Sequence, residues 1–123
     1  MFSNIIKEKY DVVFALSFFS HIPDKVFGEW IKALYEVVKP GGVLIFTTHG
    51  TLFKNRFNKM TTNGFSFDLA SEQKDLATEE YGSTVSEYEY VERKCKENIC
   101  KIPEIFEEGF WWKIQDLYII RKE

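Results

Sequence analysis

The sequence predicts an α/β fold in which a helix connects two buried, parallel strands. Residues Tyr10–Ala15 form a short run of β-branched and aromatic residues, which is typical of a strand buried on both faces of a parallel sheet. Residues 43–47 (VLIFT) form a second such run. Between them, apolar residues recur every three or four positions over residues 24–38, which indicates an amphipathic helix. Together these segments form one βαβ unit, a connection that is almost always right-handed.

The helix expected over residues 24–38 has a recognisable start and stop. Asp24 is the expected N-cap, because it follows Pro23 and precedes the first apolar position. Pro40 forbids continuation of the helix, and the two glycines that follow it allow a sharp return into the second strand.

After the second strand, the pattern is less regular. Thr51 is expected to cap a short helix over residues 52–60, whose apolar residues share one face. Residues 66–80 are polar and have no clear period, so they form either a short helix near residues 71–77 or a long insert. Long irregular segments of this kind are often lids or binding loops.

The last third of the chain predicts a helix followed by a hairpin. Residues 86–89 (SEYE) match a capping box with Ser86 as N-cap, which predicts a helix over residues 87–96. Residues 102–106 and 116–121 are expected to pair as antiparallel strands, with Gly109 ending the first of them.

Composition indicates one soluble domain over residues 1–123. Hydrophobic residues make up 45% of the chain, and a domain of this length buries roughly two thirds of its unfolded surface. The net charge of −3, without a basic stripe, argues against nonspecific nucleic-acid binding. No apolar run approaches the ~20 residues that span a bilayer, and the N-terminus lacks a signal-peptide pattern. We therefore expect a cytoplasmic protein with no membrane or nucleic-acid partner.

Aromatic and cysteine residues each allow two interpretations. Aromatic residues reach 17%, and either pack the core or line a cleft or partner surface; the pair Trp111 and Trp112 is expected in a core or interface. Cys95 and Cys100 form a single C-x4-C pair, which is a weak signal for a metal site. We expect reduced thiols in or near a core, with no bound metal.

Several motifs, at these spacings, together resemble the later half of a class I S-adenosylmethionine-dependent methyltransferase. They are YDVV at residues 10–13, FSHI at 19–22, EVVKPGG at 36–42, VLIFTT at 43–48 and QDLYIIRK at 115–122. The resemblance covers nearly the whole chain. It implies a partial Rossmann-like methyltransferase sheet, flanked by helices, whose strands are equivalent to the family's fourth, fifth, seventh and sixth. The last strand of this chain would run antiparallel.

The resemblance also implies a cofactor, S-adenosylmethionine, and a small-molecule acceptor. Leu16 and Ser17 match the family loop that lies along the cofactor, and Phe18 would help to separate cofactor from acceptor. His21 matches a histidine common in that loop, where it contacts the acceptor, acts as a base, or only fixes the loop through a backbone hydrogen bond. His49 follows the second strand and either faces an acceptor pocket or is an exposed loop histidine. His21 and His49 are the candidate catalytic residues.

One part of the family pattern has no counterpart here. Family members begin with a strand and a Gly-rich cofactor loop, followed by an acidic residue that holds the ribose, and neither precedes Tyr10. The chain therefore resembles a half-domain from a truncated or split gene product. We expect the unpaired strand edge from Tyr10 to Leu16 to recruit a second copy or a complementing chain.

Three functions remain open at this stage. The first is methyl transfer to an unknown small-molecule acceptor. The second is a catalytically inactive remnant that acts as an oligomeric or partner-binding module. The third is another doubly wound nucleotide-binding protein.

Overall fold

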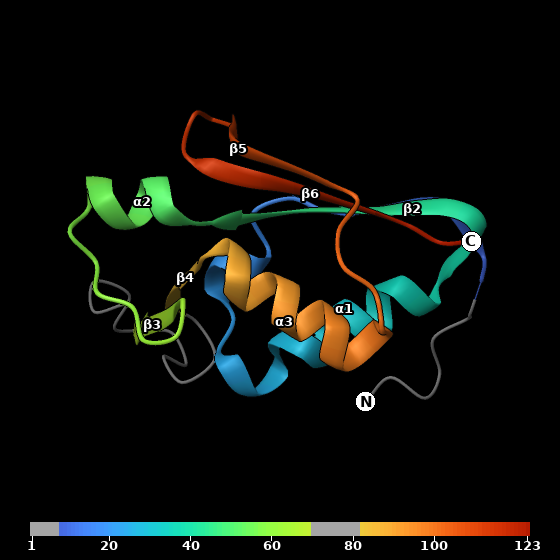
Figure 1. Cartoon of the computed structure of the whole chain (residues 1–123), viewed down its shortest axis with the longest axis horizontal. Coiled ribbons are helices and arrows are strands. Elements are labelled where there is room, and N and C mark those ends of the chain that lie inside the picture. Colours follow the sequence, from blue (N-terminus) through green and yellow to red (C-terminus); the bar gives the residue numbers. More distant parts are fainter. Residues whose placement is uncertain (1–7, 70–81) are drawn as a thin grey trace, which may run out of the picture.

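The computed structural model describes residues 8–69 and 82–123 and has a mixed α/β architecture (Figure 1). Four strands form the main sheet: β1 (Tyr10–Ala15), β2 (Val38–His49), β5 (Ile105–Trp111) and β6 (Gln115–Arg121). Their order is β1-β2-β6-β5. β1 runs parallel to β2, whereas β6 runs antiparallel to both of its neighbours. The expected α/β class with a mixed four-stranded sheet is confirmed.

Two helices cover one face of this sheet. α1 (Asp24–Glu36) and α3 (Tyr88–Ile99) lie side by side below the sheet in the view of Figure 1. A single turn, η1 (Phe19–His21), precedes α1, and the short helix α2 (Thr51–Arg56) follows β2. A second, two-stranded sheet pairs β3 (Phe65–Leu69) with β4 (Gly82–Ser86).

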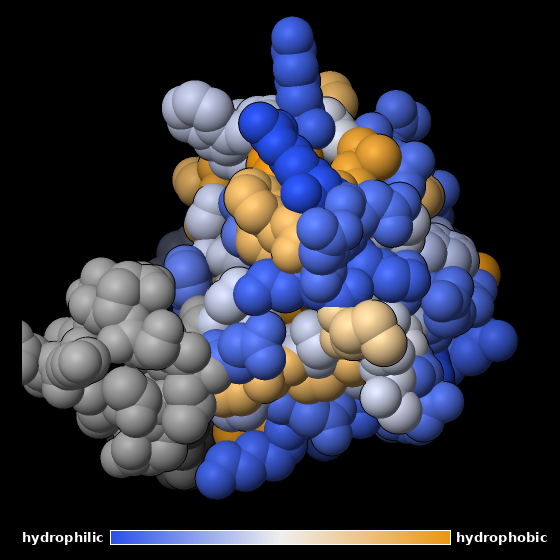
Figure 2. Space-filling view, turned by 90° about the vertical axis from the view of Figure 1, so that its left-hand side faces the viewer, coloured by the Kyte–Doolittle hydropathy of each residue, from blue (hydrophilic) through white to orange (hydrophobic). Residues whose placement is uncertain are grey.

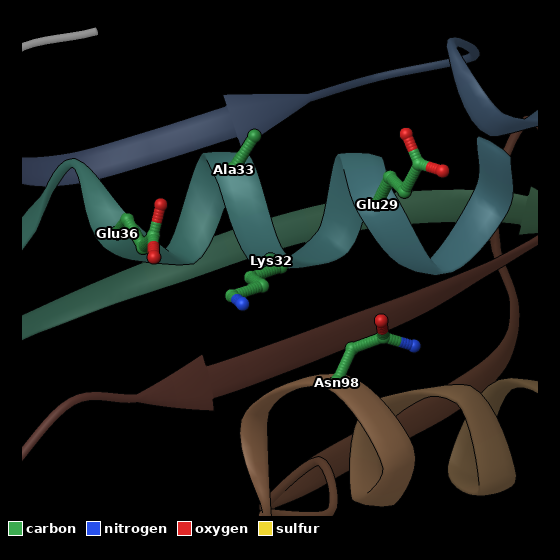
Figure 3. Close-up of a pocket in the computed structure, with 5 residues that line it drawn as sticks. All are labelled: Glu29, Lys32, Ala33, Glu36 and Asn98. Atoms are coloured by element: carbon green, nitrogen blue, oxygen red, sulfur yellow. The ribbon is translucent and has the colours of Figure 1, made fainter. Parts of the chain in front are cut away.

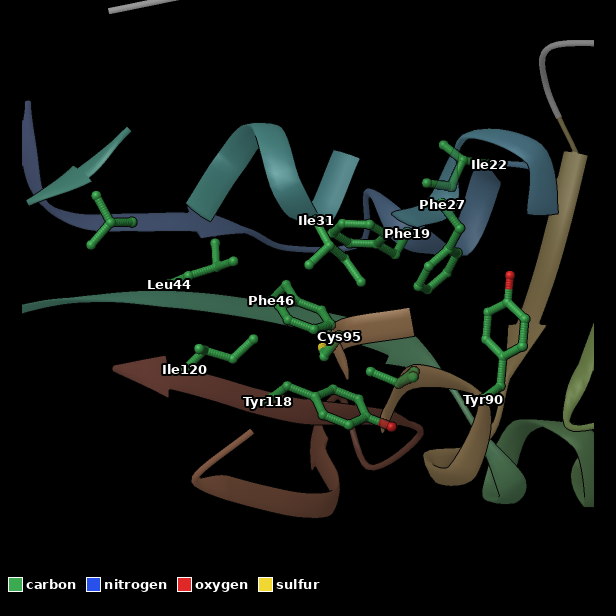
Figure 4. Close-up of a cluster of buried hydrophobic side chains, with 12 residues drawn as sticks. Phe19, Ile22, Phe27, Ile31, Leu44, Phe46, Tyr90, Cys95, Tyr118 and Ile120 are labelled. Carbon is green, nitrogen blue, oxygen red and sulfur yellow. The ribbon is translucent and has the colours of Figure 1, made fainter. Parts of the chain in front are cut away.

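The core lies between the sheet and these two helices (Figure 4). Phe46 of β2 and Tyr118 of β6 stack with ring centroids 5.0 Å apart, and both side chains are fully buried. Phe27 of α1 and Cys95 of α3 close the core from the helix side. The prediction that Cys95 belongs to a core is confirmed, whereas Cys100 is exposed.

Asp24 is not the N-cap of α1, although the helix starts there. Pro23 occupies the cap position and makes no side-chain hydrogen bond. The Asp24 carboxylate instead accepts a hydrogen bond from the Tyr90 hydroxyl and lies 3.5 Å from the Lys94 ammonium. Both partners belong to α3, so a contact between helices has replaced the local cap.

The expected capping box of α3 is also wrong. Ser86 ends β4 and is buried, and Glu87 takes the N-cap position. The Glu87 carboxylate accepts hydrogen bonds from Thr51 at 2.8 Å and from Thr61 at 2.7 Å, and Lys54 lies 3.6 Å away. Thr51 therefore starts α2 without capping it, because its hydroxyl is bound to another element.

β2 begins earlier than the expected second strand, inside the Pro-Gly-Gly segment. Its pairing with β1 shifts between Val38 and Val43, so the strand bulges there. Gly41 has a φ of +90°, which favours glycine. At Gly42 a Cβ atom would lie 2.4 Å from the Asp11 carbonyl oxygen. The two glycines are therefore needed for a bulge pressed against β1 rather than for a turn outside the sheet.

The C-terminal hairpin is confirmed, but its bounds differ from those expected. β5 begins at Ile105 rather than at residue 102. Gly109 does not end the strand; it lies within β5 at a shift of register, with a φ of +68°. The positive φ of this glycine lets the strand continue through the irregularity.

The two middle segments had no clear signal. The helix expected over residues 52–60 is shorter and ends at Arg56. The segment over residues 66–80 contributes most of β3, which the sequence did not indicate. The helix considered near residues 71–77 lies outside the described residues.

β1 contradicts the expectation of a strand buried on both faces. Val12 is 52% exposed and Phe14 is 65% exposed, because both point away from the face that α1 and α3 cover. Among the described strands, only β2 pairs with β1, so β1 forms an edge of the sheet.

Candidate functional site

The candidate site lies where the parallel strands β1 and β2 end. Because these strands run side by side in the same direction, their carboxyl ends meet at one edge of the sheet. The loop after β1 carries Ser17, and β2 ends with Thr47, Thr48 and His49. β6 enters the sheet at the same edge and places Gln115 opposite His49.

Four polar side chains from these elements form a connected group, which we call the polar edge cluster: Ser17, Thr47, His49 and Gln115. The backbone N–H of Ser17 donates to Thr47 Oγ1 at 2.8 Å, and the Thr47 hydroxyl donates to Gln115 Oε1 at 2.6 Å. The Gln115 amide group faces Ser17 Oγ at 3.0 Å and His49 Nε2 at 3.3 Å. Ser17 reaches this geometry with a φ of +64°, which is uncommon for a residue other than glycine.

This chain of hydrogen bonds determines the tautomer of His49. In this structure the Thr47 hydroxyl accepts from the Ser17 N–H and donates to the amide oxygen of Gln115, so the amide nitrogen of Gln115 faces His49. The Gln115 nitrogen therefore donates to His49 Nε2, which must be unprotonated. The proton of a neutral His49 consequently lies on Nδ1, a buried atom for which the described residues supply no hydrogen-bond partner.

His49 is also held in its neutral form. Burial, together with the nearby charge of His21, lowers the pKa of His49 to about 4. Its ring stacks on Phe53 of α2 with centroids 3.8 Å apart and an angle of 6° between the planes. His49 is therefore a weak base at neutral pH, and its ring is well fixed in orientation.

His21 lies close enough to His49 to influence its ionisation. It ends η1, and its backbone N–H donates to the Phe18 carbonyl at 3.2 Å, which closes the turn. The two histidines come from segments far apart in the sequence, and the structure brings them together at one edge of the sheet.

The three predicted cofactor residues divide between two environments. Ser17 belongs to the polar edge cluster, whereas Leu16 and Phe18 line an apolar groove of about 440 Å³ beside β1. The Phe18 ring packs edge-on against Trp30 of α1 with centroids 4.9 Å apart. The remaining lining comes from Phe14, Ala15 and Leu34. The loop after β1 thus has one polar and one apolar side.

Asp116 is a further titratable group at this edge, and the sequence reasoning did not single it out. It is buried next to Gly50, where a Cβ atom would lie 1.9 Å from Asp116 Oδ2. Burial raises the pKa of Asp116 to about 6, although the Gly109 N–H donates to its carboxylate at 3.0 Å. The signal that could have revealed it is the pair Gln115 and Asp116 at the start of an otherwise apolar strand.

The outer surface at this end of the molecule is mixed in character. Figure 2 shows apolar residues in orange among hydrophilic residues in blue, without one dominant patch. This side is the one that carries α2 and the carboxyl end of β2 in Figure 1.

A second hollow, of about 360 Å³, lies between α1 and α3 (Figure 3). It is lined by Glu29, Lys32, Ala33 and Glu36 of α1 and by Asn98 of α3. A Cβ atom on Gly28 would lie 2.1 Å from Asn98 Nδ2, so the helices approach closely beside it. We read this hollow as the groove between two packed helices.

Two negative findings concern residues 8–69 and 82–123, the part of the chain that the structure describes. Within these ranges, no three His, Cys, Asp or Glu side chains are grouped in a way that could hold a metal ion. No helix in the same ranges has the length and apolar character needed to cross a membrane.

The sequence matches no protein-family model and no curated protein.

Proposed function

We propose that this chain forms the acceptor side of a class I methyltransferase-type domain and serves S-adenosylmethionine-dependent methyl transfer to a small molecule. The observation that carries the proposal is the strand order β1-β2-β6-β5, with β1 and β2 parallel and β6 reversed. This is the order of the fourth, fifth, seventh and sixth strands that the family resemblance implies. In open α/β sheets, ligands bind beyond the carboxyl ends of the strands, which is where the polar edge cluster lies.

The residues at this edge fit part of such a site. The apolar groove of about 440 Å³ beside Leu16 and Phe18 falls within the usual size range of ligand pockets. The lining of this groove contains no acidic side chain for the ribose, so the groove would hold only part of the cofactor. When bound, S-adenosylmethionine supplies an electrophilic methyl group on a sulfonium.

The two histidines have different proposed roles. Much of the rate of an in-line displacement comes from holding the acceptor in position. His49 suits that role, because its pKa of about 4 keeps it neutral and its ring is stacked on Phe53. His21 is the candidate base when the acceptor must lose a proton.

We further propose that a partner completes the sheet along β1. The edge from Tyr10 to Leu16 carries exposed apolar side chains and pairs with no described strand on its outer side. Unpaired edges of this kind favour pairing with another chain. A complementing polypeptide or a second copy would meet this need.

A second candidate function is a catalytically inactive methyltransferase-like module that binds a partner. The open edge of β1 favours it, since that edge suits association whether or not cofactor binds.

Calorimetric titration with S-adenosylmethionine and S-adenosylhomocysteine tests the proposal. After circular dichroism shows that the chain is folded, binding at the micromolar level, which corresponds to ~8 kcal/mol, is the result expected if a second copy completes the cofactor site. Phe18→Ala should weaken binding about tenfold, since Phe18 lines the groove. The matched control, Phe110→Ala, alters a side chain that is 61% exposed on β5 and should leave binding unchanged. A folded chain that binds neither compound would contradict the enzymatic proposal and favour the partner-binding module.

A further inference from the structure

We propose that a second copy of this chain packs on the uncovered face of the main sheet, so that the two sheets lie face to face. We call this surface the bare face. It consists of Val12 and Phe14 of β1, Val43 and Ile45 of β2, Ile105 of β5, and Leu117 and Ile119 of β6.

The strand register places these side chains in one continuous apolar layer. Residues directly opposite each other on neighbouring strands point to the same face of a sheet. Phe14 lies opposite Ile45, Ile45 lies opposite Ile119, and Ile119 lies opposite Ile105. The layer therefore crosses all four strands without a polar interruption along that line.

The residues of this layer on the edge strands β1 and β5 are exposed, and those on the central strands β2 and β6 are half-buried. The alternate residues of the same strands, such as Leu44 and Ile120, are buried beneath α1 and α3 on the opposite face. On the bare face, by contrast, Phe14 is 65% exposed and Ile105 is 43% exposed. Contiguous exposed apolar patches on a protein surface often mark interaction surfaces.

The size of the bare face predicts a weak dimer. Four strands spaced about 4.8 Å apart, with about 3.3 Å of rise per residue, give a flat area of roughly 300 Å². Two such faces in contact would bury about 600 Å² in total, which lies at the small end of weak, transient interfaces. We therefore expect a Kd in the micromolar range or above.

The charges on the bare face favour a second copy as the occupant. Arg121 lies opposite Val43 at one end of this face, and Glu107 lies opposite Leu117 toward the other end. Both charged residues are exposed. A two-fold axis perpendicular to the strands would bring each Arg121 next to the partner's Glu107, giving two ion pairs by symmetry. An axis along the strands would leave Arg121 and the partner's Glu107 at different levels along the strands, so the ion pairs form only in the first orientation.

Sedimentation of charge-reversal variants, from micromolar to near-millimolar concentration, tests this arrangement. The native chain should show a reversible monomer–dimer equilibrium. Arg121→Glu should weaken the dimer about tenfold or more, because it places like charges together at two sites. Combining Arg121→Glu with Glu107→Arg should restore the native affinity. Lys25→Glu, on the exposed side of α1, is the matched control and should have no effect.

Two results would overturn the proposal. One is a native chain that stays monomeric at the highest concentration. The other is a dimer that neither weakens with Arg121→Glu nor recovers in the double variant, as expected for association through the β1 edge. Circular dichroism checks that each variant is folded, and both reversed residues are exposed. The readout does not involve cofactor, so it is independent of the methyltransferase proposal.

Discussion

Replacing Phe46 with alanine is expected to lower the free energy of unfolding by about 3–5 kcal/mol. Phe46 lies toward the carboxyl end of β2, a strand that is paired on both sides, and is fully buried. Its ring stacks on Tyr118 at 5.0 Å and tilts against Phe19, also at 5.0 Å. Removing the ring would leave a cavity between the sheet and the helices, since neighbours on two different elements cannot both move to fill it.

Urea denaturation followed by circular dichroism measures this effect. The matched control is Phe110→Ala, which removes the same side chain from a position that is 61% exposed. We expect the control to change the free energy of unfolding by no more than about 0.5 kcal/mol. Similar losses for both variants would show that Phe46 is not at the centre of the core.

The second large effect is a change in how stability depends on pH, since Asp116 and His49 act in opposite directions. The folded-state pKa of Asp116 is raised from 3.8 to about 6, so its contribution to stability is lost as the pH rises from about 4 to 6. The folded-state pKa of His49 is lowered from 6.5 to about 4, so stability is lost as the pH falls from about 6.5 to 4. In the native chain these two contributions partly cancel.

Single substitutions should therefore separate the contributions of Asp116 and His49 to the pH dependence of stability. Asp116→Asn should raise the free energy of unfolding at pH 7 and leave a steeper rise in stability between pH 4 and 6.5. His49→Gln should remove the loss of stability that protonation of His49 causes. The free energy of unfolding should then fall as the pH rises from 4 to 6. We expect each effect to be about 2 kcal/mol, after allowing for partial screening by solvent. Denaturation curves at a series of pH values measure both slopes, and identical slopes in native and variant chains would contradict the assignment.

The sequence was most informative where the apolar period was long. The stripe along α1 and the runs in β1 and β2 predicted a βαβ unit, and the alternation near the C-terminus predicted a hairpin; the structure has both. The helix N-caps at Asp24 and Ser86 were predicted wrongly. The prediction used only neighbouring residues, whereas contacts with distant elements determine what these two residues do. The Asp24 carboxylate contacts α3, and Ser86 belongs to a strand.

The candidate site was predictable only in part. Parallel strand ends meet at one edge, so the sequence could place His49 and the loop after β1 near each other. Gln115 could not be recognised, because its contact with His49 depends on the register of two strands separated by 66 positions. The exposure of the bare face could not be predicted from the sequence either. An apolar strand run has the same appearance whether one or both of its faces are covered.

The most direct test of the proposed function follows the two imidazole rings by NMR while S-adenosylhomocysteine is added. The chain contains only two histidines, so a His21→Asn variant assigns both sets of signals. If the carboxyl edge of β1 and β2 binds this ligand, the ring signals of His21 and His49 should shift together and reach saturation. Ring signals that stay unchanged, at ligand concentrations where calorimetry detects binding or at the highest concentration reached, would contradict a methyltransferase-type site at this edge.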